Sequence, residues 1–402
     1  MAFSSLYEFV RLLELRNQLV RIQAPVSPKL EMTEIVDRVS KGLVSQNRAL
    51  LFENPVGYQM PVLVNAFGSA QRMAWALGVS ELEELRRNLE QLLNLRPPQS
   101  LGAVVDRGSG LIRALRDAGI KPRKVVRAPV QAVVETDGAS LDTLPILHCW
   151  PGDGGPFITL PQVVTRDPLK GTRNVGMYRL QKVDARTLLV HWQRHKGGAE
   201  HERVARDQKL PTIPAAIVLG GDPACIWSAS APLPPDIDEY WLAGWLRGRP
   251  VPFVDCITQP LEVPANADVI IEGYVDPNEH HPEGPFGDHT GYYTPVEPFP
   301  VFHVTAITHR VDPIYPATVV GIPPMEDYWM GKATERLFLP LIQIFLPEVV
   351  DIAMPSPGVF HNLVIVSIRK RFPGHARKVI HGLWGLALLS LAKAIVVVDE
   401  WV

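Results

Sequence analysis

The first part of the chain alternates between two spacings of its apolar residues. Three stretches carry apolar side chains at helical spacing: residues 5–17, 30–43 and 80–95. Three short apolar runs have the length of buried strands: residues 19–22, 49–52 and 61–64. Ser5 is a typical N-cap residue, so the first helix should begin directly after it. This alternation predicts an α/β unit that ends near residue 120.

From about residue 121 the pattern changes to short runs of β-branched residues that proline, glycine and aspartate interrupt. The runs cover residues 130–134, 162–166, 187–192, 215–219, 269–271 and 301–308. Helical spacing interrupts them near residues 199–208 and 237–247. Many short strands separated by turn signals predict a barrel or a compact, mostly antiparallel sheet over residues 121–315.

Beyond residue 315 the alternation of helices and strands returns. The predicted helices are residues 334–345 and 376–391, and the predicted strands are residues 363–368 and 394–398. The whole pattern predicts a mixed α/β (α+β) fold in three units, which cover residues 1–120, 121–315 and 316–402. The length agrees with this division, because 402 residues are too many for one ordinary hydrophobic core.

Charge and composition narrow the classes of protein. The formal net charge is −2 and no long basic run is present, so nothing favours a nucleic-acid partner. No apolar run reaches the length of a bilayer span, and the first residues do not resemble a secretory signal. The three cysteines are widely spaced, which is typical of a reducing compartment: Cys149, Cys225 and Cys256. We therefore expect a cytoplasmic protein.

The most informative stretch is residues 280–293, which holds two carboxylates, Glu283 and Asp288. It also holds three histidines: His280, His281 and His289. Pro285 and the glycines around it disfavour a helix or a central strand, so we expect an ordered loop. If the two carboxylates converge, repulsion and poor solvation should raise the pKa of at least one, giving a proton donor near neutral pH. A solvated acidic turn is the alternative, and this segment alone favours neither.

Other segments carry residues that could bind anions or metal ions. Arg179 could hold a carboxylate bidentately, although an ordinary arginine on a surface strand is the more frequent case. His191 and His195 follow an apolar strand, where a lone histidine is more often structural than a ligand. Glu239 begins a predicted helix, where the helix dipole alone would favour a carboxylate. Asn174, His195 and Glu239 form a nitrogen–oxygen set compatible with Mn²⁺ or Mg²⁺, but their spacing does not show that they meet.

Several segments together resemble the UbiD-type decarboxylases. The run Glu283-Gly-Pro-Phe-Gly-Asp288-His-Thr-Gly-Tyr-Tyr resembles the signature of this family. Further matches are Leu19-Val-Arg-Ile, Phe67-Gly-Ser-Ala-Gln-Arg-Met, residues 174–179, Trp192-Gln-Arg-His-Lys-Gly-Gly and Gly374-His-Ala-Arg. The matches span residues 1–400 in consistent order, and on them the chain is identified as a member of this family.

The resemblance implies a split β-barrel flavin-binding domain in the middle unit and prenylated FMN as the cofactor. In the family a divalent ion, Mn²⁺ (or Mg²⁺), holds the phosphate of the cofactor, with K⁺ nearby. The metal ligands implied by position are Asn174, His195 and Glu239. The catalytic network implied by position is Arg179, Glu283 and Asp288. Arg179 and the metal ligands also count among the cofactor-binding residues, and the remaining ones implied are Thr159, Met177, Ser230 and, at the phosphate, Lys378.

The activity implied is a reversible, non-oxidative decarboxylation of an aromatic acid, most simply a 3-polyprenyl-4-hydroxybenzoate of ubiquinone biosynthesis. The segments Met325-Glu-Asp-Tyr and Gly331-Lys-Ala-Thr-Glu-Arg resemble the naphthoate decarboxylases of menaquinone routes, which are an alternative. Two further alternatives are an inactive, cofactor-binding partner subunit and an FMN-dependent reductase.

The resemblance also implies partners and a difference in length. A flavin prenyltransferase should supply the cofactor, and like subunits should assemble into a dimer or hexamer. A prenylated substrate would also bring the protein to a membrane surface as a peripheral associate. Relatives continue well past a strand like that at residues 394–398, so the third unit is short for the family.

Overall fold

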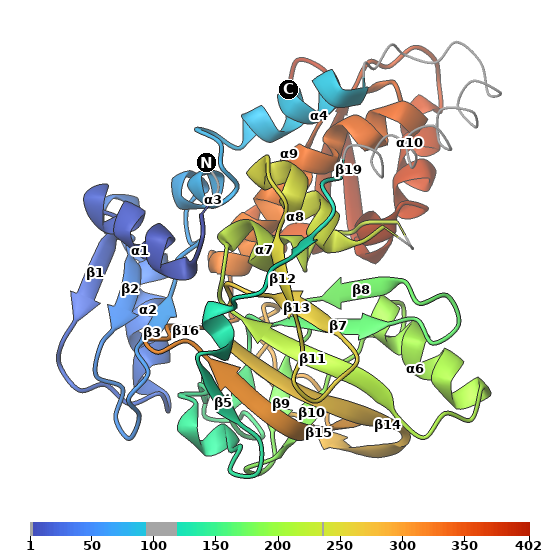
Figure 1. Ribbon diagram of the computed structural model, residues 1–402. Helices are drawn as coiled ribbons and strands as arrows, with labels where there is room; N and C mark the ends of the chain where they lie inside the picture. Colours follow the sequence, from blue (N-terminus) through green and yellow to red (C-terminus); the bar gives the residue numbers. More distant parts are fainter. Residues whose placement is uncertain (1–2, 94–118, 235–236) are drawn as a thin grey trace.

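The computed structural model describes residues 3–93, 119–234 and 237–402. Figure 1 shows a blue N-terminal region, a central sheet in green, yellow and orange, and a red C-terminal region above it. Helices and sheets occur in all three regions, so the predicted mixed α/β class is confirmed. Within the described residues no helix has both the length and the apolar character needed to cross a lipid bilayer.

The N-terminal region is a small sheet with helices packed against it. The strand order is β1-β2-β3-β16, with β1 parallel to β2 and β2 antiparallel to β3. The strands are β1 (Leu19–Ile22), β2 (Ala49–Phe52), β3 (Val62–Val64) and β16 (Tyr315–Pro316). The helices are α1 (Leu6–Leu15), α2 (Glu31–Lys41), α3 (Ala70–Ala76) and α4 (Glu83–Leu93). The predicted helices and strands of this region are confirmed; residues 94–95 of the third predicted helix lie outside the described residues.

Two contacts from far along the chain complete this region. β16 pairs in parallel with β3, so residues 315–316 belong to the N-terminal sheet. Helix α9 (Glu326–Phe345) begins with buried Glu326, whose two oxygens accept hydrogen bonds from the backbone of Asn65 and Phe67, each at 2.9 Å. The domain boundaries at residues 120 and 315 remain predictions.

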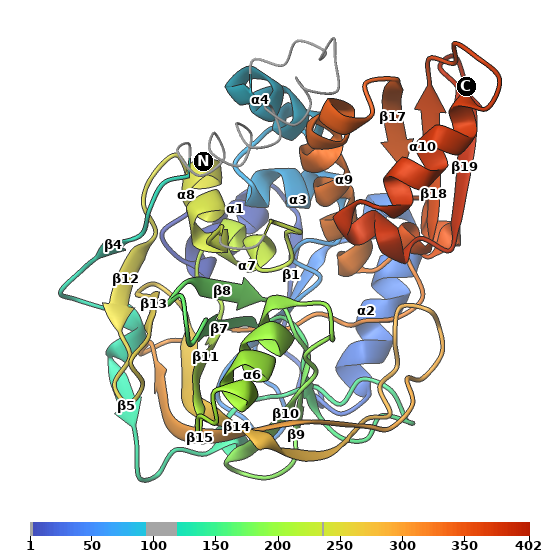
Figure 2. The same ribbon diagram turned by 90° about the vertical axis from the view of Figure 1, so that its right-hand side faces the viewer.

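The central region is dominated by one large sheet in which every neighbouring pair is antiparallel, as predicted. Its order is β6-β9-β10-β15-β14-β11-β7-β8, with β5 paired to β15. The strands are β5 (Val133–Glu135), β6 (Phe157–Ile158), β7 (Gln162–Arg166), β8 (Arg173–Gly176), β9 (Leu180–Lys182), β10 (Thr187–Val190), β11 (Ile213–Leu219), β14 (Val269–Glu283) and β15 (Glu297–His309). Figure 2 shows α6 (Gly197–Asp207) lying against this sheet.

Smaller elements flank the sheet on the side of α9. The strands β4 (Arg123–Lys124), β12 (Pro252–Asp255) and β13 (Glu262–Pro264) form a separate sheet in the order β13-β12-β4. The helices α7 (Pro223–Ser228) and α8 (Glu239–Arg247) pack on each other, and Tyr240 of α8 makes an edge-to-face contact with Phe253 of β12.

Two predictions in the central region are wrong in extent. Residues 129–131 form a single 3₁₀ turn, because Pro129 fits the first position of a helical turn, and β5 starts only at Val133. The loop predicted over residues 280–293 starts at Gly284, because β14 runs on to Glu283. A register shift between Val275 and His280 lets β14 keep its pairing with β15 despite the prolines in this segment.

The C-terminal region packs helices on a three-stranded sheet with the order β17-β18-β19. Its elements, besides α9, are β17 (Val349–Ala353), β18 (Leu363–Ile368), α10 (His375–Trp384) and β19 (Ala394–Asp399). The helix predicted over residues 376–391 ends early, because glycine is a poor helix former and Gly385 caps α10. A 3₁₀ turn, Ala387–Leu391, follows it.

Shared hydrophobic cores hold the regions together. One core joins the N-terminal sheet to the central sheet and includes the fully buried rings of Phe52 and Phe302. Another joins the N-terminal helices to α7 and α9 through Phe67, Trp227 and Leu337. Because these cores cross the region boundaries, the strand ends of the central sheet are held in fixed positions relative to α9.

Candidate active site

Arg179 and Glu283 meet at the central sheet although 104 positions separate them in the chain. Arg179 lies between β8 and β9, and Glu283 is the last residue of β14. The guanidinium donates from Nε to Glu283 Oε1 at 2.7 Å and from Nη2 to Glu283 Oε2 at 3.0 Å. The Glu283 side chain is 0% exposed. This forked pair joins two of the three residues that were expected to form one network.

Two further contacts fix the guanidinium of Arg179. Its Nη2 also donates to Thr294 Oγ1 at 3.1 Å, and its Cζ lies 4.4 Å from the centroid of the Phe286 ring. Within the part of the chain that the structure describes, the remaining nitrogen, Nη1, has no hydrogen-bond partner. Arg179 therefore keeps donor capacity for a further anion beside Glu283.

His191 is the second side-chain partner of Glu283. Its Nδ1 lies 3.1 Å from Glu283 Oε2, and its ring packs on Phe299 of β15 with the centroids 4.0 Å apart. The backbone N–H of His191 donates to the carbonyl of Arg179 at 3.1 Å. The two residues therefore face each other across the β9–β10 pairing and reach the same carboxylate.

The expectation that Glu283 or Asp288 has a raised pKa is wrong in this structure. Burial acts to raise the pKa of Glu283, but hydrogen bonds from His191 and Arg179 and the charges of those groups outweigh it. Burial is likewise outweighed at Asp288, whose pKa is lowered by the hydrogen bonds and charge of His289. Each acid has a cationic or donating partner, so repulsion between the two acids is not the controlling effect.

Asp288 interacts with the charge of Arg179 and contacts His289, which packs against other rings. The charge of Arg179 contributes to its low pKa, while its Oδ1 lies 2.6 Å from His289 Nδ1. The His289 ring packs against the rings of Phe360 and His361, with centroids 5.3 and 4.9 Å away. Asp327 of α9 interacts electrostatically with His289, and burial raises the pKa of Asp327 to about 7. In this cluster it is therefore Asp327, and not Asp288, whose pKa is raised.

A turn at residues 150–154 positions the loop that carries Asp288. Asp153 accepts a hydrogen bond from the backbone N–H of Gly287 at 2.7 Å. A Cβ at Gly287 would lie 2.2 Å from the Trp150 ring, so this close approach requires glycine. Gly284 has φ of +99°, a conformation that other residues rarely adopt, where the chain leaves β14. The glycines of the signature therefore shape the loop.

The predicted metal ligands lie on adjoining segments. Glu239 Oε2 accepts a hydrogen bond from the backbone N–H of Val175 at 2.9 Å, next to Asn174. A Cβ at Gly197 would lie 2.0 Å from Asn174 Oδ1, so the Asn174 side chain lies against the turn that follows His195. The structure thus brings together the three segments, which spacing alone could not do.

The electrostatics of this set suit a cation. Burial raises the pKa of the Glu239 carboxyl to about 8, and the neighbouring acid Asp238 adds to the shift. A divalent ion would stabilise the charged form of Glu239. Among the described residues no group of three or more His, Cys, Asp or Glu could hold a metal, so a site here would need the amide of Asn174.

The other predicted cofactor-binding residues lie in two different regions of the structure. The backbone N–H of Met177 donates to the carbonyl of Ala229 at 2.8 Å, which brings Met177 beside Ser230. Thr159 is buried, and its Oγ1 accepts a hydrogen bond from the Thr318 backbone at 3.1 Å. Lys378, by contrast, lies on α10 in the C-terminal region, where it pairs with Glu348 at 2.7 Å. Their roles toward a cofactor remain predictions.

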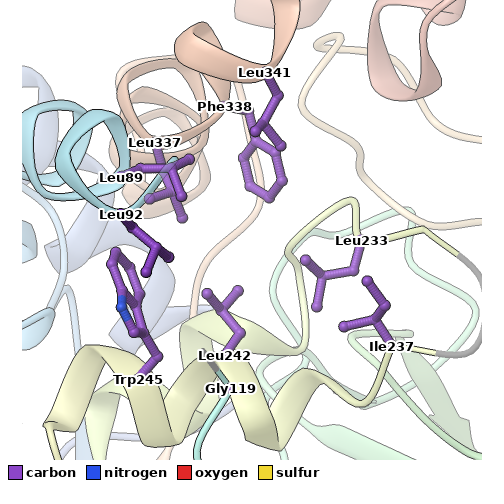
Figure 3. A pocket seen from close by; sticks show the side chains of 10 residues that line it. All are labelled: Leu89, Leu92, Gly119, Leu233, Ile237, Leu242, Trp245, Leu337, Phe338 and Leu341. Carbon is purple, nitrogen blue, oxygen red and sulfur yellow. The ribbon is translucent and has the colours of Figure 1, made fainter. Parts of the chain in front are cut away.

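A separate apolar pocket lies between α4, α8 and α9 (Figure 3). Its lining residues are Leu89, Leu92, Gly119, Leu233, Ile237, Leu242, Trp245, Leu337, Phe338 and Leu341. None of them is a predicted site residue, and none carries a charge that could hold a carboxylate or phosphate. This pocket suits an apolar group rather than the reacting acid.

Several residues of the network were not predicted as site residues: Asp153, His191, Thr294, Asp327 and His361. His191 directly precedes the matched segment that begins at Trp192, but its spacing gave no sign that it reaches Glu283. Asp327 and His361 come from the C-terminal region, and Asp153 from a turn before β6. Only the packing of distant segments brings them to the same place, so no local pattern could have identified them.

Family models describe the chain over most of its length. The model for the 3-octaprenyl-4-hydroxybenzoate carboxy-lyase N-terminal domain matches residues 10–92, the Rift-related domain matches residues 123–323, and the C-terminal domain matches residues 328–402. The fold therefore belongs to a carboxy-lyase, that is, a decarboxylase. The chain is a member of the UbiD family.

Relatives and solved structures agree with this assignment. An uncharacterized protein of Archaeoglobus fulgidus is 50% identical over 400 residues, which cover 100% of this chain and 81% of that protein. An evolved dimeric form of the UbiD-class enzyme HmfF from Pelotomaculum thermopropionicum, in complex with prFMN, is 28% identical, with a TM-score of 0.83 and coverage of 100% and 86%. The closed form of Sedimentibacter hydroxybenzoicus vanillic acid decarboxylase is 27% identical, with a TM-score of 0.87 and coverage of 100% and 82%.

Proposed function

We propose that this chain catalyses reversible, non-oxidative decarboxylation of an aromatic acid with prenylated FMN, most simply of a 3-polyprenyl-4-hydroxybenzoate in ubiquinone biosynthesis. The observation that carries the proposal is the buried Glu283, forked to an Arg179 that keeps one nitrogen available. The solved relatives support the substrate class and the cofactor, since one is a vanillic acid decarboxylase and another holds prFMN.

The residues divide the chemistry between binding and proton transfer. Arg179 Nη1 would hold the substrate carboxylate, because its other two nitrogens are already held by Glu283 and Thr294. Glu283 and Asp288 would handle the proton that replaces CO₂ on the substrate carbon. Prenylated FMN, when bound, supplies the electron sink for the pair of electrons that CO₂ leaves behind.

Asn174, His195 and Glu239 would hold the Mn²⁺ (or Mg²⁺) that fixes the phosphate of the cofactor, with K⁺ nearby. The raised pKa of Glu239 supports this role, because burial outweighs the charge of Arg173 there and a bound cation would stabilise the carboxylate. Thr159, Met177 and Ser230 would contact the cofactor, and Lys378 would approach its phosphate.

Three further relationships belong to the same proposal. A flavin prenyltransferase supplies the cofactor. The chain assembles with copies of itself, and one solved relative is a dimeric form. A prenylated substrate brings the protein to a membrane surface.

The test is to produce the protein together with a flavin prenyltransferase, identify the bound flavin by mass spectrometry, and measure CO₂ release. We expect prenylated FMN and turnover of 3-prenyl-4-hydroxybenzoate. Preferred turnover of a naphthoate would move the chain to menaquinone synthesis. Bound prenylated FMN without turnover of any acid would make it an inactive partner subunit, and plain FMN with NAD(P)H oxidation would make it a reductase.

A further inference from the structure

The predicted ligand Asn174 lies between two contacts that join β8 to the start of α8. Directly before it, Arg173 donates from Nη1 to Asp238 Oδ2 at 2.5 Å. Directly after it, the backbone N–H of Val175 donates to Glu239 Oε2 at 2.9 Å. Three consecutive residues of the strand thus meet two consecutive residues at the start of the helix. The two contacts together fix Asn174 and Glu239 relative to each other.

Arg173 is itself held by the small sheet beside α8. Its Nη2 donates to Glu262 Oε2 of β13 at 2.9 Å, and its Cζ lies 4.6 Å from the ring centroid of Phe253 in β12. The Arg173 side chain is 9% exposed. Because a guanidinium is planar and presents its donors in a fixed fork, these contacts also set the direction in which Nη1 points toward Asp238.

Asp238 uses both carboxylate oxygens to hold the start of α8. Its Oδ1 accepts a hydrogen bond from the backbone N–H of Tyr240 at 2.9 Å, which makes Asp238 the N-cap of the helix. Its Oδ2 accepts the hydrogen bond from Arg173. Asp238 therefore connects the first turn of the helix to Arg173, while the next residue, Glu239, is the proposed ligand.

Stability alone is a weak explanation for a charged pair at this place. Within the described residues, Arg173 Nε is buried and has no hydrogen-bond partner. Burying an incompletely bonded charge costs free energy, and the loss of hydration offsets much of the attraction in a buried ion pair. A metal site, by contrast, depends on the exact placement of its ligands. Groups that orient metal ligands change metal affinity about 10- to 100-fold.

We propose that Arg173 is a positioning residue for the divalent cation. Through Asp238 it holds the start of α8 against β8, so that Asn174 and Glu239 reach the same Mn²⁺. Its role is to place the ligands, and it needs no bond to the ion. The inference rests on the proposed metal site and adds the residue that sets the geometry of that site.

The first test is the Mn²⁺ affinity of Arg173→Lys. The holoenzyme is dialysed against a series of Mn²⁺ concentrations, and bound manganese per chain gives the dissociation constant. Lysine keeps the charge but lacks the fork, so it cannot hold Asp238 and Glu262 together. We expect the dissociation constant to rise about 10-fold. Arg166→Lys is the matched control and should stay within twofold of wild type, because Arg166 lies opposite Arg173 in the β7–β8 register and donates to Glu262.

The second test is a double-mutant cycle with Asp238→Asn. Asparagine keeps the N-cap hydrogen bond but loses the charge that pairs with Arg173, so this variant also decides the question where Arg173→Lys does not fold. We expect the dissociation constant again to rise about 10-fold. Arg173→Lys/Asp238→Asn should lose no more affinity than the weaker-binding single variant, because the two residues act through one contact.

Three results would overturn the role of Arg173. The first is a Mn²⁺ dissociation constant within twofold of wild type in both single variants, whatever the change in unfolding temperature. The second is a double variant in which the two losses multiply, since the residues would then act independently. The third is an equal loss in Arg166→Lys, since the effect would then come from charge near Glu262 and not from the contact with Asp238.

The wild type separates this inference from the proposed function. Wild-type holoenzyme that binds no Mn²⁺ would overturn the metal site and the role of Arg173 together. Wild type that binds Mn²⁺ but releases no CO₂ would overturn the decarboxylase, and the affinities of the variants would still decide the role of Arg173. An active wild type with variants that bind Mn²⁺ equally tightly overturns the role of Arg173 alone.

Discussion

Glu283 and Glu239 are two glutamates of the central region, the first buried and the second partly buried, and their pKa values shift in opposite directions. Arg179 and His191 stabilise the negative charge of Glu283, so the pKa of Glu283 lies below its ordinary value despite burial. At Glu239 burial prevails and raises the pKa to about 8. Burial alone therefore does not set the charge of a carboxyl; the partners that the fold provides decide it. The first arrangement suits proton and carboxylate chemistry, and the second suits a cation that arrives from outside the chain.

The largest effect is expected from Glu283→Gln, which keeps the shape of the side chain but removes its charge and proton. The kcat for decarboxylation should fall about 10³-fold or more, while the absorbance spectrum of the bound flavin is retained. Glu297→Gln is the control, because Glu297 is exposed and directly opposite Glu283 in the β14–β15 register. Normal turnover by Glu283→Gln would end its assignment as the proton-handling acid.

Glu239→Ala tests the second of the two glutamates, which is proposed to hold a cation. Metal and cofactor should be lost together, since the carboxylate that holds the ion is gone, and both can be measured as bound manganese and flavin per chain. Glu34→Ala, which removes an exposed acid from the first turn of α2, should leave both unchanged. Retention of metal and flavin in Glu239→Ala would remove Glu239 from the ligand set.

Arg179→Lys tests whether Glu283 needs a forked partner or only a positive charge. Lysine is a point charge without the two-edged guanidinium, so we expect kcat/KM to fall about 10²-fold, with a raised KM for the acid. Steady-state kinetics at several substrate concentrations separate the two parameters. An unchanged KM would show that the substrate carboxylate binds elsewhere.

The smallest effect concerns Asp327, whose pKa of about 7 lies above its unfolded value. Between these two pKa values the folded state keeps the proton of Asp327 and the unfolded state has lost it. The folded protein is therefore most stable at low pH, and it loses this stability as the pH rises through about 7. The free energy of unfolding of wild type, measured by thermal unfolding, should fall by about 1 kcal/mol between pH 5 and pH 8. The effect is small because Asp327 is partly exposed, so solvent screens its charge. Asp327→Asn should lack this loss, while Asp137→Asn, at an exposed position, should behave as wild type.

Much of the fold followed from local patterns, because helix and strand periodicities are properties of short segments. The elements β1, β2, β7 and β18 have the predicted bounds, and the central sheet is antiparallel as expected. The prediction for residues 280–293 was wrong because pairing with a distant strand overrode local signals. β14 continued through Pro277 and Pro282 to Glu283 because β15 lies beside it, and no local rule anticipates that partner.

The sequence by itself determined the three-part pattern of elements and, through its matched segments, the family and the choice of Arg179, Glu283 and Asp288 as predicted catalytic residues. Tertiary structure decided which groups surround them: His191 and Thr294 at the Arg179–Glu283 pair, and Asp327 beside His289. The physical reason is that chemical identity is local, whereas ionisation depends on neighbours within a few ångströms. Those neighbours come from strands and helices that are distant in the chain and meet only when their apolar faces pack.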